Sequence, residues 1–544
     1  MQENRMERLL KNTSIFIILT FLVYGIFLPQ LPTISSDELW ETSRAYYLKT
    51  EHKPGDPLAP ESVAPYYSAA SNLGWKSWCI FTLKTGTFAS MMYILPVDPV
   101  YAMRYGMLLW SILACVFTFL IARALHLNYW YSILCVAFLV SLPEFFSQVH
   151  RERSEIMICA SLLGFVYFFI KTMKSSSGNI HFFKLIVLGF TSWLPSILIH
   201  PSGIIIPVVI GVLYLYFERE GLFTLKTVLI GFSLLIGFLF FLEIMDSMKQ
   251  YTIEAGGGNY FLVKGPPVII KGWKYIVTLP ITFYNKFYAA NVLARPVSFI
   301  IYSVAIILIA LQTFNKKIIV QEKLDFVLIA VSAMVSLFIL YFFSGSYGNY
   351  NVIAAPFFMI LFVKYIERNS KLAIPTRRFS VITSFVLLIV FSVNGLSLGR
   401  DFKMAQEYSF LKSRVRKKIP QKVNVLGSAI YYDSFKDQNY YSTSWFDPNS
   451  GKVGQSFKVA VEVLNVKYVI IDDAFVSRAF SDRGEQWTDS MLSYLDFNGK
   501  VVDEFDANYF INNPATSITS LPKKWRYPNQ VEGYIHKVKV YKLD

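Results

Sequence analysis

Long apolar runs dominate the first 400 residues of the chain. A membrane-spanning helix needs about 20 predominantly apolar residues, and about eleven runs approach that length. The predicted spans are residues 14–31, 105–123, 129–147, 156–173, 183–199, 202–217, 226–245, 296–314, 324–343, 351–366 and 379–398. Residues 268–290 carry three lysines and a proline, so we interpret them as an interfacial helix. The pattern predicts a polytopic α-helical membrane protein.

The last part of the chain has a soluble composition and a different pattern. Short segments rich in β-branched and aromatic residues predict strands at 423–432, 467–472, 500–505 and 535–543. Helical patterns at 457–465 and 485–497 lie between them. Such alternation is typical of a small α/β domain. We therefore divide the chain into a membrane domain, 1–399, and a C-terminal extracytoplasmic α/β domain, 400–544.

The charge distribution predicts the orientation in the membrane. The net charge of +15 could indicate nucleic-acid binding, but most of the excess falls in residues 1–399. There the basic residues trace alternate short loops, which marks the cytoplasmic side. The loops in question contain Arg5, Arg8, Lys11, Arg123, Lys171, Lys174, Lys184, Arg219, Lys226, Lys316, Lys317, Lys323, Arg368, Lys371, Arg377 and Arg378. An odd number of spans then places residues 400–544 outside, and we expect a bacterial inner membrane and no nucleic-acid partner.

Two long segments fall on the outer side, residues 32–104 and 246–295. The first begins with the adjacent carboxylates Asp37 and Glu38, a few residues beyond the first span. Two carboxylates at a membrane interface suit a general base or a metal ligand. The alternative is a solvated helix N-terminus, with Ser35 or Ser36 as the cap.

Three further polar features share this predicted side. The turn 150–155 carries Arg153 and Glu155, which suit phosphate binding or an Arg–Glu network that caps two helices. His200 begins a turn that ends at Gly203; taken by itself, this motif predicts only a turn with a polar residue at its tip. The loop 347–351 contains Tyr347 and Tyr350, which could belong to a binding site or to an aromatic belt at the membrane interface. Because separate outer loops supply all of these residues, we expect them to form one site.

The order of these motifs resembles the GT-C superfamily of integral-membrane glycosyltransferases. The similar branch contains the protein O-mannosyltransferases and the lipid A aminoarabinose transferase, also described as glycosyltransferase family 39-like. Its Asp-Glu pair matches Asp37-Glu38, its Arg-x-Asp/Glu element matches Arg153-Ser154-Glu155, its His with a following Gly matches His200 and Gly203, and its Tyr-rich loop matches Tyr347, Tyr350 and Pro356. The Pro-Pro element of many members is missing from residues 63–78, where Lys76, or Lys84 further on, would substitute.

The resemblance implies a function for each of these residues. The donor would be a sugar on a polyprenyl phosphate, and the acceptor a hydroxyl of a lipid, glycan or protein. Asp37 would be the catalytic base, with Glu38 and Glu155 orienting it; a divalent metal, if bound, would use Asp37 and Glu155. Donor phosphate or sugar binding would fall to Arg153, Lys76, His200, Tyr347 and Tyr350.

Two other classes of protein fit a chain of this kind. A polytopic transporter or lipid flippase of cell-envelope glycan assembly would show two similar halves, and the sequence contains no internal repeat. A non-catalytic assembly protein would tolerate neutral substitutions at Asp37, Glu38 and Glu155.

Overall fold

The computed structural model describes residues 5–27, 36–55, 57–58, 76, 79, 82–149, 154–174, 179–217, 224–254, 351–370, 382–392, 410, 412–442, 457–472, 485–507 and 536–544. The chain divides into two compact units. The first comprises Met1–Leu28, Met107–Ile244 and Pro266–Leu396, and the second Pro29–Gly106, Met245–Gly265 and Ser397–Asp544. The predicted segments 268–290, 296–314 and 324–343, and the predicted boundary at residue 400, lie outside the described residues.

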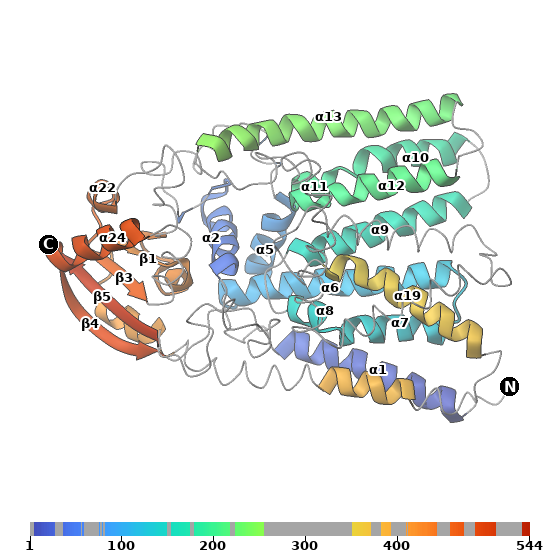
Figure 1. Cartoon of the computed structure of the whole chain (residues 1–544), viewed down its shortest axis with the longest axis horizontal. Coiled ribbons are helices and arrows are strands. Elements are labelled where there is room, and N and C mark those ends of the chain that lie inside the picture. The colour runs from blue at the N-terminus through green and yellow to red at the C-terminus, as the bar shows by residue number, and fades with distance from the viewer. Residues whose placement is uncertain are drawn as a thin grey trace. The chain divides into compact units, whose positions relative to one another are not determined.

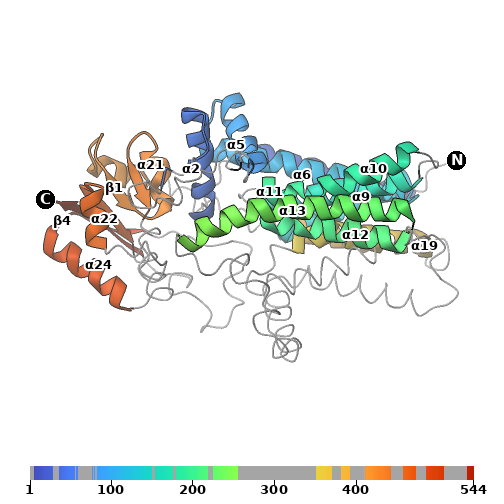
Figure 2. The ribbon, with the colours of Figure 1, turned by 90° about the horizontal axis from the view of Figure 1, so that it is seen from above.

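Apolar helices that run roughly parallel to one another build the first unit (Figures 1 and 2). They are α1 (Arg5–Phe27), α6 (Pro99–Ala124), α7 (Tyr129–Ser141), α8 (Pro143–Gln148), α9 (Ser154–Lys174), α10 (Asn179–Thr191), α11 (Leu194–Leu198), η3 (Pro201–Ile204), α12 (Ile205–Phe217), α13 (Leu225–Glu254), α19 (Asn351–Ser370) and a helix at Ile382–Ser392. Within the described part, Arg8–Phe27, Pro99–Ala124, Ser154–Lys174 and Thr227–Ile244 are long and apolar enough to cross a membrane. The predicted polytopic helical membrane protein is confirmed.

Prolines follow a break or a turn in two of the predicted spans. Residues 129–147 form α7 and α8, because Leu142 is extended (φ −70°, ψ 131°) and Pro143 opens the next helix. Residues 183–199 form α10 and α11, and Pro195 lies in the first turn of α11. Proline lacks the amide hydrogen that a helix interior needs, but fits a first turn. Prediction of residues 129–147 as a single helix was therefore wrong at Leu142, whereas Phe182–Leu198 remains one apolar helical segment with a turn at residues 192–193.

Basic side chains at one end of the first unit hold helix ends together. Lys174, in the last turn of α9, donates a hydrogen bond to the carbonyl of Ala124, at the end of α6. Lys364 of α19 reaches the neighbouring carbonyl of Leu125 at 3.3 Å. Cationic side chains are favourable near helix C-termini, where unpaired carbonyls gather. The predicted common side of Arg123 and Lys174 agrees with this arrangement, and its assignment to the cytoplasm stays a prediction.

A five-stranded mixed sheet forms the centre of the C-terminal part of the second unit. The strands are β1 (Val425–Gly427), β2 (Tyr440–Ser442), β3 (Tyr468–Asp472), β4 (Gly499–Ala507) and β5 (His536–Leu543), in the order β2-β1-β3-β5-β4. Strands β2, β1 and β3 are parallel, whereas β5 is antiparallel to β3 and β4. Helices α22 (Phe457–Val463) and α24 (Glu485–Asn498) complete the predicted α/β domain.

The predicted strand at 423–432 is wrong over its second half. Strand β1 ends at Gly427, and the helical turns η7 (Ala429–Tyr431) and α21 (Tyr432–Phe435) follow. These turns bury consecutive aromatic residues, so their apolar run looks like that of a buried strand. A Cβ atom at Gly427 would lie 2.5 Å from the Tyr440 hydroxyl, so a larger residue at the strand end would displace that hydroxyl.

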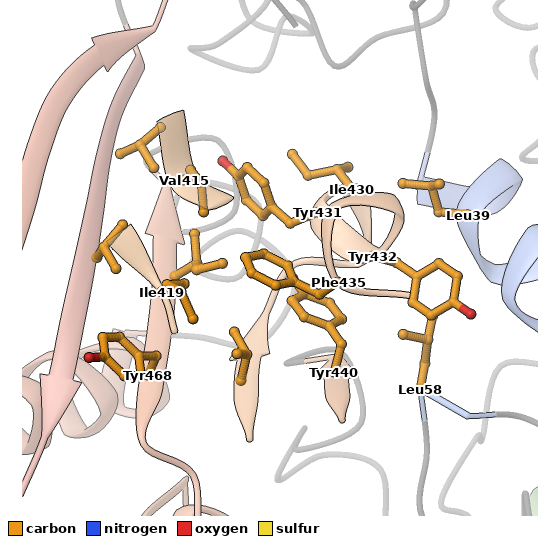
Figure 3. Close-up of a cluster of buried hydrophobic side chains, with 14 of the residues drawn as sticks. Leu39, Leu58, Val415, Ile419, Ile430, Tyr431, Tyr432, Phe435, Tyr440 and Tyr468 are labelled. Carbon is orange, nitrogen blue, oxygen red and sulfur yellow. The ribbon is translucent and has the colours of Figure 1, made fainter. Parts of the chain in front are cut away.

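The sheet has two apolar faces, because successive side chains of a strand point to opposite sides. Leu426 and Val469 lie on one face and pack with α22 and α24. Val425 and Ile470 lie on the other face and pack with η7 and α21. Leu39, Leu58 and Val100, from the predicted first outside loop, belong to this second cluster (Figure 3). Part of the core of the sheet domain therefore comes from a segment more than 300 residues earlier in the chain.

An ion pair should make the stability of the second unit depend on pH. The Arg414 guanidinium binds both carboxylate oxygens of Asp503 in β4, at 3.0 and 3.1 Å. This hydrogen bonding lowers the pKa of Asp503, so its contribution is present above the unfolded value of about 3.9 and is lost as the pH falls further. We expect Asp503→Asn to lower stability at pH 7 by less than about 1 kcal/mol, since the pair is partly solvated. Thermal unfolding of the purified chain at pH 7 and pH 3 should show a difference between variant and wild type that shrinks at pH 3. A difference that stays constant would contradict this assignment.

Candidate functional site

Helix α2 (Ser36–Glu51) carries the predicted catalytic pair in its first turn. The helix begins at Ser36, so the backbone of Asp37 lies where the helix dipole favours an anion. The Asp37 side chain lies outside the described part of the structure. Its role as a base stays a prediction. The position of its backbone is compatible with that role.

Glu38 is not part of a solvated helix end. Its side chain is fully buried, and Arg104 of α6 binds both carboxylate oxygens, through Nε at 3.0 Å and Nη2 at 3.2 Å. Arg104 is also fully buried. A planar guanidinium matches a carboxylate at two points, so the pair fixes the direction of both side chains. The contact holds the residue next to Asp37 against α6.

Arg104 was missed by the sequence analysis. It precedes the predicted span 105–123 by one residue, on the side that the charge pattern assigns to the outside. Arg104 thus shares with Arg153 an unusual position for a basic residue, on the side opposite the basic loops. A charged side chain that is buried away from water needs a partner of opposite charge. No motif in the sequence connects residue 104 with residue 38, so the partner could not be identified.

Helix α5 (Thr82–Ile94) also binds α2, through Glu41, which lies one turn after Glu38 on the same face. Lys84 pairs with Glu41 at 2.8 Å, and Arg44 also contacts Glu41, at 3.3 Å. Two helical turns further along, Lys49 of α2 donates to the carbonyl of Met92 at 2.9 Å. The two helices therefore run in the same direction, joined near both ends. Lys84, named from the sequence as a substitute phosphate ligand, is nearly buried in this ion pair.

In the first unit, Glu155 occupies the first turn of α9. It is 2% exposed, and its Oε2 atom makes no hydrogen bond with the described residues. A buried carboxylate oxygen of this kind can accept a cation or a donor. Arg153, the predicted phosphate ligand beside it, lies outside the described residues. The role of Glu155 as an orienting residue or metal ligand stays a prediction.

His200 caps the short helix η3. Its Nδ1 atom accepts from the backbone N–H of Ser202 at 3.2 Å and lies 2.8 Å from the Ser202 hydroxyl. Because an N–H donates to Nδ1, the neutral ring carries its proton on Nε2. The turn with a polar tip that the sequence predicts is present, with a defined orientation of the imidazole.

Gly203 is required by the packing of this turn. A Cβ atom there would lie 2.7 Å from the backbone nitrogen of Ser196 and 2.8 Å from the carbonyl carbon of Pro195. We expect Gly203→Ala to destabilise the chain by about 1–3 kcal/mol, because backbone must move to admit the methyl group. The thermal unfolding midpoint of the purified protein should fall. Gly231→Ala, in α13 with nothing within 4 Å of the new atom, is the matched control and should not lower it. Equal effects of both variants would contradict the steric explanation.

Three predicted donor ligands remain: Lys76, Tyr347 and Tyr350. Lys76 is half-buried, and Tyr347 and Tyr350 lie outside the described residues. Among the described residues, no three His, Cys, Asp or Glu side chains form a group that could hold a metal ion. Asp37 and Lys76 belong to the second unit, whereas Glu155 and His200 belong to the first. The convergence of these residues on one cavity stays a prediction.

Comparisons with known proteins place the fold. No family model matches the sequence, and neither does any curated protein. Among solved structures, the apo oligosaccharyltransferase of Archaeoglobus fulgidus matches with a TM-score of 0.53 and 12% identity, over 90% of this chain and 73% of that one. The same enzyme in complex with Zn and sulfate matches with a TM-score of 0.52 and 10% identity, over 90% and 71% of the two chains. ArnT from Cupriavidus metallidurans bound to undecaprenyl phosphate matches with a TM-score of 0.47 and 9% identity, over 89% and 96%. The oligosaccharyltransferase has a GT-C fold, so the GT-C-like fold that the motifs predict is confirmed.

Proposed function

We propose that the chain is an integral-membrane glycosyltransferase. It moves a sugar from a polyprenyl-phosphate donor to an acceptor hydroxyl on a lipid, glycan or protein at the outer face of the membrane. The observation that carries the proposal is the acidic pair in the first turn of α2, on a helix locked by buried ion pairs, within a GT-C fold. A general base must be held at a fixed distance and orientation from the proton that it accepts, and the ion pairs restrict the movement of α2 accordingly.

The reaction in this proposal is a single displacement. The acceptor oxygen attacks the anomeric carbon and gives its proton to the Asp37 carboxylate. A new carbon–oxygen bond forms while the bond from the anomeric carbon to the phosphate oxygen breaks, and the electron pair leaves with the polyprenyl phosphate. Attack opposite the leaving group inverts the anomeric configuration, and no covalent sugar–enzyme intermediate forms.

The other residues have supporting parts in this proposal. Glu38 positions Asp37 through its contact with Arg104, whereas Arg153 and Lys76 neutralise the charge that develops on the departing phosphate. His200, Tyr347 and Tyr350 bind the donor sugar or phosphate. Glu155 orients the base or, with Asp37, holds a divalent cation, which would stabilise the leaving phosphate.

The test is transfer by the purified chain in nanodiscs. Undecaprenyl-phosphate hexoses and pentoses are supplied one at a time, with envelope lipids, glycans and peptides as acceptors. Mass spectrometry follows the release of undecaprenyl phosphate and the mass added to the acceptor. We expect release from one class of donor, with the product in the inverted configuration. Translocation of the lipid across vesicles without any transfer would overturn the proposal in favour of a flippase.

A further inference from the structure

The C-terminal sheet domain and helix α2 share one hydrophobic core. Leu39, two residues after Asp37, is fully buried in a cluster that contains Ile430 of η7 and Tyr432 of α21. Figure 3 shows Ile430 and Tyr432 on the side of the cluster that faces Leu39 and Leu58. Because Leu39 is fully buried there, it contributes to the core of the sheet domain and does not merely contact its surface.

Two further attachments follow along the same loop. Leu58, just beyond α2, is fully buried, and its carbonyl accepts a hydrogen bond from the backbone N–H of Ser442 at 3.2 Å. Ser442 ends β2, an edge strand whose outer backbone groups would otherwise need water or another partner. Before α6, Asp98 pairs with Lys436 at 3.3 Å. The attachments thus occur at the beginning, the middle and the end of the segment 36–100.

The contact of Leu39 with the sheet domain lies on a different side of α2 from the two ion pairs. Glu38 and Glu41 bind Arg104 and Lys84, whereas Leu39 enters the core of the sheet domain. Residues one apart on a helix point in different directions, so α2 is held from two sides in its first two turns. The sheet domain is therefore not an independent module attached by a linker.

We propose that the C-terminal α/β domain is a positioning element for the catalytic loop, with Tyr432 as the residue that holds the first turns of α2. The role assigned to Asp37 rests on the proposed function; the clamping of α2 by the domain does not. Loss of the clamp releases α2 without removing any group that binds the donor. The domain acts on the rate of the chemical step rather than on the affinity for the lipid phosphate.

The test compares three variants of the full-length protein. Tyr432→Ala removes the contact, and Tyr432→Phe keeps its ring. Tyr494→Ala is the control for position: it truncates a tyrosine on the opposite face of the same sheet, although Tyr494 is half-buried and Tyr432 is buried. Hydrogen–deuterium exchange is measured in peptides covering 36–51. We expect exchange about tenfold faster for Tyr432→Ala, and within about twofold of wild type for Tyr432→Phe and Tyr494→Ala. Ile430→Val is a milder second variant that should shift exchange in the same direction if Tyr432→Ala does not fold.

Binding and turnover separate positioning from general loss of structure. Undecaprenyl phosphate should bind all variants within about twofold of wild type. With a donor that reacts, Tyr432→Ala should lower kcat about tenfold at unchanged KM. Unchanged exchange in α2, or equal acceleration by Tyr432→Ala and Tyr494→Ala, would overturn the proposal. If no donor reacts, the proposed glycosyltransferase function fails, and the exchange data still decide whether the domain holds α2.

Discussion

Replacement of Arg104 by methionine should cost the protein about 3–5 kcal/mol of stability, because it leaves the buried Glu38 carboxylate without the guanidinium that neutralises it. Both side chains are fully buried, so water cannot take over the lost hydrogen bonds. Thermal unfolding of the purified full-length chain, followed by tryptophan fluorescence, should show a large fall of the midpoint.

The double variant Glu38→Gln/Arg104→Met is the informative companion. Gln keeps nearly the shape of Glu but carries no charge, so the double variant should recover much of the lost stability. We expect it to transfer sugar slowly all the same, because α2 has lost the contact that orients its first turn. Arg104→Lys should fall between the two, since a lysine supplies the charge but not the two-point geometry. A double variant no more stable than Arg104→Met would show that charge is not the reason for the loss.

Periodicity and composition were sufficient to predict most of the helices and four of the five strands, but not β2 or the order of the strands in the sheet. The apolar runs at 14–31, 105–123 and 156–173 correspond to α1, α6 and α9, and the strands at 467–472 and 535–543 correspond to β3 and β5. Local chemistry decides such elements, so a sequence reveals them. The errors occur where the backbone changes over a few residues: one span breaks at Leu142 before Pro143, and helical turns after Gly427 replace the second half of a predicted strand.

Contacts between distant parts of the chain could not be predicted in this way. Glu38 and Arg104 are 66 residues apart, and Leu58 reaches Ser442 across most of the sequence. Adjacent acids at a helix start look the same in a sequence whether both are solvated or one is buried, and only the position of Arg104 distinguishes the cases. The division of roles between Asp37 and Glu38 was therefore expected from the resemblance, but the buried contact of Glu38 with Arg104 was not.

That division leads to the largest expected effect on catalysis. Asp37→Asn should lower the rate of sugar transfer by about 10²–10⁴-fold, because an amide cannot take the proton of the acceptor hydroxyl. Asn has a similar shape, and loss of one charge from the first turn of a helix costs no more than about 1 kcal/mol, so the thermal unfolding midpoint should stay close to that of wild type. Undecaprenyl phosphate should still bind, since the variant removes no positive charge.

A second carboxylate on the same helix supplies the control. Glu51, the last residue of α2, is exposed, and Glu51→Gln removes one negative charge from the helix without touching its first turn. We expect normal transfer from this variant. Wild-type rates from Asp37→Asn would remove Asp37 from the role of base and would direct attention to Glu155, the other acid that the resemblance assigns to the site, whose buried Oε2 atom makes no hydrogen bond with the described residues. Loss of transfer in both variants would instead mean that the negative charge of α2, and not a proton acceptor at its start, supports the reaction.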